Sequence, residues 1–317
     1  MKVIDHIKKA KSTLFSMEIL PPLRGNGVQS IFNILDPLME FKPPFIDVTY
    51  HREEYIYKKR DGGYLEKVST RKRPGTVGIC AAIQNKYKVD AVPHIICGGF
   101  SKDETENALI DLSFLGIENV LAIRGDARKT EQAFVPEPDG HTYSVDLVKQ
   151  VVNMNKGIYI DSITQIADDT NFCIGVAGYP EKQFESPNMK TDLKYLKKKI
   201  EAGADYIVTQ MFFDNQKYFD FVKECRKTGI KCPIIPGLKP VTIKKQLHDL
   251  PTIFNIDLPP DLSEELEKCK TDKEAFEVGI QWTIQQSKEL IKFGIPCLHY
   301  YTLDGTDAVK LIASAVF

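Results

Sequence analysis

Several short apolar runs in this chain end at polar residues whose side chains could do chemistry. The polar residues are Glu18, Thr49, Gln210 and the tripeptide Arg124-Gly-Asp126, and they follow the runs at 14–17, 45–48, 206–209 and 119–123. Such runs are typical of buried parallel strands. Polar groups gathered at the exit ends of several parallel strands are typical of an active site on an α/β barrel.

Glu18 is the first candidate for catalysis. It stands in Ser16-Met-Glu-Ile-Leu-Pro-Pro22, between apolar neighbours and before two prolines that end the strand. A glutamate there is poorly solvated, which would raise its pKa and suit it to donate a proton at neutral pH. The alternative is a carboxylate paired with a buried lysine or arginine. Because charged side chains are rarely buried without a function, we favour the catalytic interpretation.

Other strand-end residues suit a flat, polar ligand. Arg124-Gly-Asp126 supplies a cation, a backbone position that allows close approach, and an anion, although alone it could be a solvated salt bridge. Gln210 offers a donor and an acceptor for an amide-like or pterin-like ring edge. The neighbouring pair Phe212 and Phe213 could stack on such a ring or belong to the core. Tyr179 is a further candidate to cover a ring.

Histidines and cysteines do not form a metal-binding pattern in the sequence. His94 lies in Val92-Pro-His-Ile-Ile-Cys97 with no second ligand at metal spacing, so we expect a hydrogen-bonded histidine near a ligand. The seven cysteines are odd in number and form no Cys-x-x-Cys motif, which predicts buried, reduced thiols.

Strand-like and helix-like segments that could position these residues alternate along the chain. Strands are expected at 14–20, 45–50, 92–97, 119–123, 173–178, 206–210, 233–236 and 297–301. Helices are expected at 28–41, 76–88, 103–115, 144–155, 189–202, 216–228, 261–292 and 306–316. This alternation predicts a single-domain (β/α)₈ TIM barrel over 1–317, with a doubly wound sheet as the alternative.

The phase of the first strand and the long loops agree with a barrel. Phe15, Met17 and Ile19 alternate with Ser16 and Glu18, so the apolar set can face the helices while the polar pair points inward. In the last strand, Leu298 and Tyr300 should face one way and His299 and Tyr301 the other. Long loops are expected at about 51–75, after the second strand, and at 127–142. Both would emerge on the catalytic face.

Composition excludes several other classes of protein. The 317 residues carry a net charge of −1, which argues against a nucleic-acid-binding protein. No run approaches the 18 apolar residues of a membrane span, and Val3, Ile4, Ile7 and Ala10 have the spacing of a short amphipathic helix. We therefore expect a cytoplasmic protein without a membrane partner. There is no P-loop motif.

Ten blocks along the chain together resemble the methylenetetrahydrofolate reductase family. They are Ser16–Pro22, Asp47–Tyr50, Val92–Ile95, Ala122–Asp126, Tyr143–Leu147, Val176–Glu181, Asp192–Lys199, Ile207–Asp214, Ile234–Gly237 and His299–Leu303. The resemblance implies a (β/α)₈ barrel that carries FAD. It also implies reduction of 5,10-methylenetetrahydrofolate to 5-methyltetrahydrofolate, which supplies methyl groups for methionine synthesis.

The resemblance also implies a mechanism. Glu18 would be the general acid that protonates N10 and opens the five-membered ring to a reactive iminium. Flavin reduced by NAD(P)H would then deliver a hydride in ping-pong turnover. Asp126 would be the carboxylate that favours the cationic iminium. Gln210 would contact the folate ring, and Gln246 would lie near substrate and nicotinamide.

Further positions follow from the same resemblance. The residues expected to hold FAD are Thr49, His94, Arg124, Gly125, Asp126, Tyr143, Ser144, Tyr179, Asp192 and Lys199. Two positions depart from some relatives. Leu250 replaces a phenylalanine that closes over the ligands and would cover a ring by apolar contact, and Gln183 replaces a cofactor-contacting histidine. The chain ends with the barrel, so we expect no regulatory domain and no inhibition by S-adenosylmethionine.

Some questions stay open at this point. NADH is favoured over NADPH, although the 51–75 loop offers candidates for a 2′-phosphate in Arg52, Lys58, Lys59, Arg60 and Arg71. Helix 261–292 could pair subunits in a homo-oligomer or cover the barrel. Another flavin barrel, of the proline dehydrogenase kind, would need a basic clamp that we do not find. A flavin- or folate-binding barrel that is active only as a subunit of a larger complex is the remaining alternative.

Overall fold

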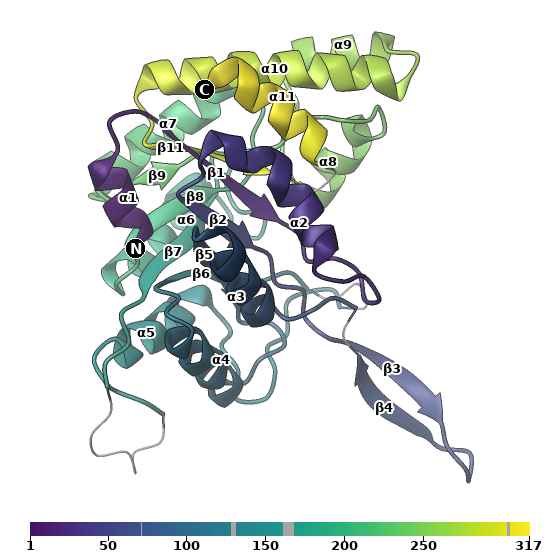
Figure 1. The fold of residues 1–317 in the computed structure, drawn as a ribbon, viewed down its shortest axis with the longest axis vertical. Helices are drawn as coiled ribbons and strands as arrows, with labels where there is room; N and C mark the ends of the chain where they lie inside the picture. Colours follow the sequence, from purple (N-terminus) through teal and green to yellow (C-terminus); the bar gives the residue numbers. More distant parts are fainter. Residues whose placement is uncertain (71, 128–130, 161–167, 303–304) are drawn as a thin grey trace.

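A ring of parallel strands forms the centre of the molecule (Figure 1). The computed structural model describes residues 1–70, 72–127, 131–160, 168–302 and 305–317, so Arg71 and Leu303 lie outside the described residues. The ring strands are β1 (Leu14–Ile19), β2 (Phe45–Val48), β5 (Asp90–Ile96), β6 (Asn119–Ile123), β7 (Cys173–Gly178), β8 (Tyr206–Thr209), β9 (Ile234–Ile235), β10 (Gly237–Leu238) and β11 (Cys297–Tyr301). They pair in the order β10-β11-β1-β2-β5-β6-β7-β8-β9.

The seventh position of the ring is a strand in two pieces. β9 pairs with β8 and β10 pairs with β11, and Pro236 separates them. Proline has no N–H to donate, but the Pro236 carbonyl accepts a hydrogen bond from the His299 N–H at 3.1 Å. Together the two pieces bridge β8 and β11, which confirms the (β/α)₈ prediction and makes the doubly wound alternative wrong.

Helices surround the ring, mostly where the apolar periodicity predicts them. They are α1 (Val3–Lys9), α2 (Gln29–Leu35) with the 3₁₀ helix η1 (Asp36–Phe41), α3 (Thr76–Tyr87), α4 (Lys102–Phe114), α5 (Ser144–Met154), α6 (Met189–Glu201), α7 (Asn215–Lys227), α8 (Gln246–Phe254), α9 (Pro260–Lys268), α10 (Asp272–Phe293) and α11 (Thr306–Val316). Among the described residues, no helix is long and apolar enough to cross a membrane.

The single helix predicted at 261–292 is wrong, because the chain breaks between α9 and α10. The Thr271 side chain accepts a hydrogen bond from the Glu274 N–H at 3.2 Å and so caps a new helix. The sequence interpretation also missed α8, which contains Pro251. A proline at that position argues against a helix from propensity alone, and packing of Leu247 and Leu250 into a local hydrophobic cluster stabilises it instead.

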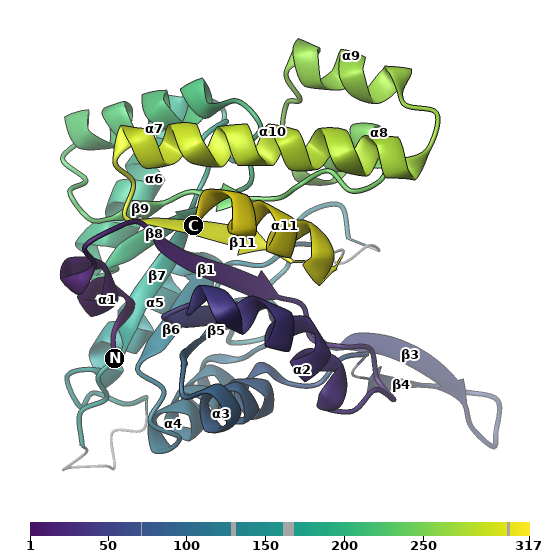
Figure 2. The ribbon, with the colours of Figure 1, turned by 45° about the horizontal axis from the view of Figure 1, so that its top comes forward.

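The segment predicted as an irregular loop at 51–75 contains a β-hairpin. β3 (Glu54–Lys59) and β4 (Leu65–Thr70) are antiparallel and extend away from the barrel in both views (Figures 1 and 2). The turn at 61–63 contains Gly62 and Gly63, both with positive φ. Dense charge hid the strand pattern in the sequence. The other predicted loop, 127–142, has no helix or strand in its described part.

Three apolar clusters hold the barrel together. The largest lies between the strands and the surrounding helices and includes Phe15, Met17 and Ile19. A second one fills the inside of the ring at the amino ends of the strands, where Val3 of α1 joins inward residues of the strands. The third packs α8, α9 and α10 together with residues that follow β8. The polar site residues therefore lie at the other end of the ring, above the inner cluster.

Candidate active site at the carboxyl ends of the strands

Register across β1 places its polar residues inside the barrel. Glu18 pairs with Asp47 on β2 and with Tyr301 on β11, and Ser16 pairs with His299. Phe15, Met17 and Ile19 of β1 belong to the outer cluster, as their alternation predicted. Leu298 and Tyr300 of β11 likewise face outward, whereas the His299 ring lies inside against Ser16. The predicted phase of both strands is confirmed.

Glu18 is the centre of a buried polar network. Glu18 is only 8% exposed. The Thr49 hydroxyl donates a hydrogen bond to Oε1 at 2.8 Å. On the other oxygen, Oε2, the His94 Nε2 lies 3.5 Å away and the His299 Nε2 lies 3.9 Å away. The Ser16 Oγ is 2.9 Å from the His299 Nδ1 and orients that ring. Glu18, Thr49 and His94 are thus brought together as expected.

The predicted pKa of Glu18 is wrong in direction. Burial alone raises the pKa of this carboxyl, as the sequence suggested, but His94, His299 and the Thr49 hydroxyl together lower it below its ordinary value. The reverse holds for His94, because burial lowers its pKa while Glu18 and Asp47 raise it above the ordinary value. The proton of this buried pair therefore rests on the imidazole.

Sequence reasoning missed Asp47 and His299 as members of this network. Asp47 is 1% exposed, and its Oδ2 lies 3.6 Å from the His94 Nε2. His94 was expected to be hydrogen-bonded, but neither of its ring nitrogens has a hydrogen-bond partner among the described residues. The available signal was the phase of β2, since Asp47 lies two residues after the inward-facing Phe45.

Arg124, Gly125 and Asp126 follow β6 at the same end of the barrel. Gly125 has φ +80°, and a Cβ there would meet Ile96 at 3.3 Å, so glycine allows both the turn and the close packing. Arg124 pairs with Glu185 and lies over the Phe134 ring at 5.0 Å. Asp126 is exposed.

Residues after β7 and on α6 support the loop beside Arg124. Asp192 accepts hydrogen bonds from the Gln183 N–H and the Ser186 hydroxyl, each at 3.1 Å. Lys199 donates to the Ala177 carbonyl at 2.9 Å, and burial lowers its pKa to about 8. Burial, with Asp126 and Asp192, raises the pKa of Tyr179 to about 12. Tyr179 therefore lies within electrostatic range of both carboxylates.

Two further groups of predicted residues lie on other elements of the structure. Tyr143 precedes α5 and is 60% exposed, and Ser144 begins that helix. Gln210, Gln246 and Leu250 border the third apolar cluster, in which Leu250 is 3% exposed. The Gln210 Oε1 accepts from the Met211 N–H at 2.8 Å, and the Gln246 Oε1 accepts from the Thr242 N–H at 2.7 Å.

Phe212 and Phe213 are core residues, which was the simpler of the two readings. Phe212 is 1% exposed and stacks on Tyr218, with centroids 5.3 Å apart. Phe213 is 2% exposed, and its carbonyl accepts a hydrogen bond from the Trp282 indole at 3.0 Å. All seven cysteines are free, and six of them are buried, which confirms that prediction.

Comparison with known proteins identifies the family. Residues 2–316 match the family model described as methylenetetrahydrofolate reductase. The chain belongs to the methylenetetrahydrofolate reductase family. It is similar to 5,10-methylenetetrahydrofolate reductase of Salmonella typhimurium, with 30% identity over 91% of this chain and 86% of the relative.

Eukaryotic members of the methylenetetrahydrofolate reductase family are similar over the same region. Methylenetetrahydrofolate reductase (NADH) 1 of Arabidopsis thaliana is 33% identical over 96% of this chain and 49% of the relative. The chain thus spans about half the length of such relatives. The chain is also similar to a solved structure, that of an uncharacterized protein from Clostridium thermocellum that binds two copies of 5-methyl-5,6,7,8-tetrahydrofolic acid. The TM-score is 0.60 at 15% identity, and the match covers 99% of this chain and 97% of the other chain. That likeness supports the fold.

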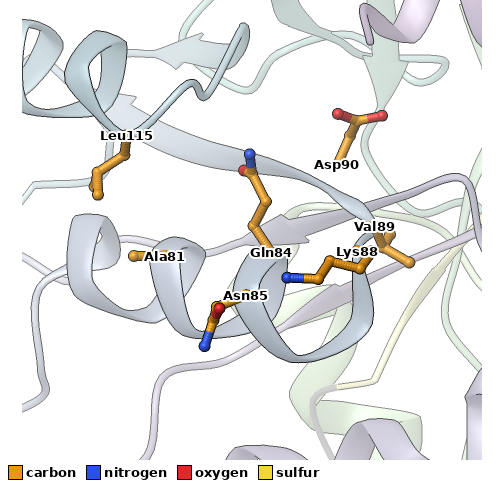
Figure 3. A pocket seen from close by; sticks show the side chains of 7 residues that line it. All are labelled: Ala81, Gln84, Asn85, Lys88, Val89, Asp90 and Leu115. Atoms are coloured by element: carbon orange, nitrogen blue, oxygen red, sulfur yellow. The ribbon is translucent and has the colours of Figure 1, made fainter.

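Two surface hollows lie outside the ring of strands of this methylenetetrahydrofolate reductase family member. One, of about 480 Å³, lies between α3 and α4 and is lined at its end by Asp90, the first residue of β5 (Figure 3). It is therefore at the opposite end of the barrel from Glu18. The other, of about 670 Å³, lies beside the carboxyl ends of the strands between Tyr50, Thr76 and Phe100. Among the described residues, no cluster of histidine, cysteine and carboxylate side chains could hold a metal ion.

Proposed function

We propose that this protein reduces 5,10-methylenetetrahydrofolate to 5-methyltetrahydrofolate with NAD(P)H, by ping-pong hydride transfer through bound FAD. The cell would use the product as a methyl donor for methionine synthesis, and we place the enzyme in the cytoplasm. The observation that carries the proposal is the buried Glu18–His94 pair at the mouth of the barrel, in a chain of this family. It provides a carboxylate and, on the neighbouring imidazole, a proton where the reaction needs a general acid.

The chemistry assigned to Glu18 is protonation of the leaving nitrogen of the folate ring. Because the pKa of Glu18 is lowered and that of His94 is raised, His94 holds a proton beside Glu18 and can transfer it from Nε2 to Oε2 to replace the proton that Glu18 donates. The Thr49 hydroxyl holds Oε1 and leaves Oε2 as the atom that exchanges the proton. Asp126, exposed at the mouth, would stabilise positive charge that develops on the folate.

Residues at and after the carboxyl ends of the strands supply groups that could hold a flavin. Neither His94 nitrogen has a hydrogen-bond partner in the part of the chain that the structure describes, Gly125 allows close backbone approach through its positive φ, and Lys199 is a partly buried cation suited to an anionic group. Thr49, Arg124, Tyr143, Ser144, Tyr179 and Asp192 are the other residues that we propose to hold FAD. When bound, FAD would accept a hydride from NAD(P)H and pass it to the methylene carbon of the folate.

On the substrate side, we propose that Gln210 and Gln246 bind the folate and the nicotinamide in turn. Each uses its Oε1 to accept a backbone N–H, and this hydrogen bond orients the amide group. Leu250 would support this side through apolar contact. Relatives include proteins named for NADH and for NADPH, and we propose NADH as the preferred donor.

The first test is the visible spectrum of the purified protein, followed anaerobically. We expect a flavin spectrum that bleaches when NADH is added and recovers when 5,10-methylenetetrahydrofolate is added. A colourless protein that gains no spectrum with FAD would reject a flavoenzyme. Bound flavin with no turnover by the chain alone would favour the alternative of a barrel subunit that needs a partner.

Glu18→Gln tests the assigned acid. This variant should keep its flavin and its reduction by NADH, and it should lose roughly 10²–10⁴-fold in the rate of folate reduction, because an amide cannot donate the required proton. The matched control is Asp205→Asn, which removes a carboxylate that accepts the Ile174 N–H near the amino end of β7. Folate reduction by Glu18→Gln at the wild-type rate would remove Glu18 from its role.

A further inference from the structure

Asp47 is a buried carboxylate to which the proposed function gives no part. It is 1% exposed, and neither carboxylate oxygen has a hydrogen-bond partner among the described residues. An ionised carboxylate in such a place is strongly unfavourable unless a cation faces it. The His94 Nε2, 3.6 Å from the Asp47 Oδ2, is positioned to be that cation.

The same ring nitrogen also faces the catalytic carboxylate. The His94 Nε2 lies 3.5 Å from the Glu18 Oε2, almost the same distance as from Asp47. Both distances are slightly longer than a hydrogen bond, so a movement of about 0.5 Å would complete a bond to either oxygen. Because neither ring nitrogen has another described hydrogen-bond partner, no other hydrogen bond holds the imidazole to one side.

Because both Glu18 and Asp47 lie beside the His94 ring, the ring has a neighbouring carboxylate whether Glu18 is ionised or protonated. When Glu18 is ionised, the protonated ring is paired with it. When Glu18 is neutral and ready to act as an acid, only Asp47 keeps the protonated ring from being an unpaired buried charge. Asp47 therefore makes the state with protons on both Glu18 and His94 accessible.

We propose that Asp47 is a positioning residue that keeps His94 protonated beside Glu18, so that the imidazolium returns a proton to Glu18 after Glu18 has protonated the folate. The inference rests on the proposed function. In the return step the N–H bond at His94 Nε2 breaks and an O–H bond forms at Glu18 Oε2. His94 is left neutral and regains a proton from solvent, which matches the one proton that folate reduction by NAD(P)H consumes.

Other titratable groups face this trio from the neighbouring elements. They are His51 after β2, Cys80 on α3, Tyr206 on β8, and Cys297, His299 and Tyr301 on β11. Burial raises the pKa values of these thiols and phenols, so they remain neutral at physiological pH. Burial and Arg73 lower the pKa of His51. Glu18 and Asp47 are thus the anions that face His94.

Asp47→Asn tests the proposal in the flavin-loaded enzyme. Loss of the charge should lower the pKa of His94, so the rate of flavin reoxidation by 5,10-methylenetetrahydrofolate should begin to fall with rising pH about one unit earlier. Reduction of the flavin by NADH should keep its pH profile. Titration of ¹⁵N-histidine by NMR, with His94 assigned by its loss in His94→Gln, should show the same shift. Asp47→Ser, also neutral and smaller, repeats the test if the asparagine does not fold.

The control and the contrary outcomes are distinct. Asp205→Asn should leave both the His94 titration and the pH profile of folate reduction unchanged. If His94 titrates identically in wild type, Asp47→Asn and Asp47→Ser, Asp47 does not hold its charge and the proposal is overturned. If the wild type does not reduce the folate at all, the proposed function fails and the return step fails with it. The NMR titration would still report separately whether Asp47 keeps His94 protonated.

Discussion

Glu18 and His94 determine each other's charge inside the barrel. The pKa of Glu18 is lowered, so its contribution to stability is present above its ordinary value of 4.5 and is lost as pH falls through the lowered pKa. The pKa of His94 is raised, so its contribution is fully present below its ordinary value of 6.5 and is lost as pH rises through the raised pKa. Both contributions are complete only between these two ordinary values.

This window makes a prediction for Glu18→Gln that needs no substrate. The variant should be less stable than wild type by about 2 kcal/mol between pH 4.5 and 6.5, because it loses a charge-assisted interaction, and the deficit should shrink as pH rises above that window. Urea unfolding at several pH values measures it. Glu201→Gln, which changes an exposed residue on α6, should show no such profile. A deficit independent of pH would mean that the pair is not charged in the folded protein.

At the scale of elements, α10 approaches the segment after β10 so closely that only glycine fits between them. A Cβ on Gly279 would collide with the carbonyl of Val241 and lie 3.0 Å from the Val241 Cα. This contact joins α10 to the segment that leads into α8, and so it fixes the side of the barrel mouth where Gln246 lies. The close approach is made to backbone, which cannot rotate away as a side chain would.

Two glycine substitutions in helices should therefore have opposite effects. Gly279→Ala should destabilise the protein by about 1–3 kcal/mol, because backbone must move to make room. Gly78→Ala on α3, where a Cβ would meet nothing within 4 Å, should stabilise it by about 0.5–1 kcal/mol through helix propensity. Thermal or urea unfolding of the two variants measures both. Equal effects would show that the contact between α10 and Val241 yields at no cost.

Regular elements were predictable from the sequence where the apolar period was strong. Seven of the eight ring strands, the first amphipathic helix and α11 lie where the pattern places them, with ends shifted by a residue or two. The pattern failed where local composition and packing disagree. Thr271 breaks a continuous apolar stripe, Pro251 conceals α8, Pro236 divides a strand, and charged residues conceal the β3–β4 hairpin.

The site was predictable to the extent that strand phase determines it. Glu18, Thr49 and His94 meet because they leave neighbouring strands on the same side. Burial raises the pKa of Glu18 and the neighbouring imidazoles lower it, and the sequence could not show which effect is larger. The predicted direction of the pKa shift was therefore wrong. It also could not give His299 a role, because the ring must close before β11 lies beside β1, whereas the phase of β2 could have indicated Asp47.

At the scale of the whole molecule, the main outer cluster and the third cluster are joined through the segment after β8. Phe212 belongs to the former and Phe213 to the latter, and the only tryptophan, Trp282 on α10, bonds to the Phe213 carbonyl. Adjacent residues of one short segment thus lie in both clusters. Unfolding of either cluster would disrupt the other.

Unfolding should consequently be a single transition. Urea unfolding followed by Trp282 fluorescence, which reports on the third cluster, should coincide with unfolding followed by far-ultraviolet circular dichroism, which reports on the barrel. A fluorescence transition at lower urea concentration would show that α8, α9 and α10 come apart before the barrel. In that case the side of the mouth with Gln246 and Leu250 would be an independent unit.

The apolar cluster inside the ring, covered by Val3 of α1, closes the amino end of the barrel and leaves the mouth as its opening. Water, and any proton from it, reaches Glu18 and His94 through the mouth, which is also where the folate would lie. A bound folate would then cover the mouth and separate the protons already on Glu18 and His94 from solvent. The one proton that folate reduction consumes would therefore enter before the folate binds or after the product leaves, and not while the folate covers the mouth.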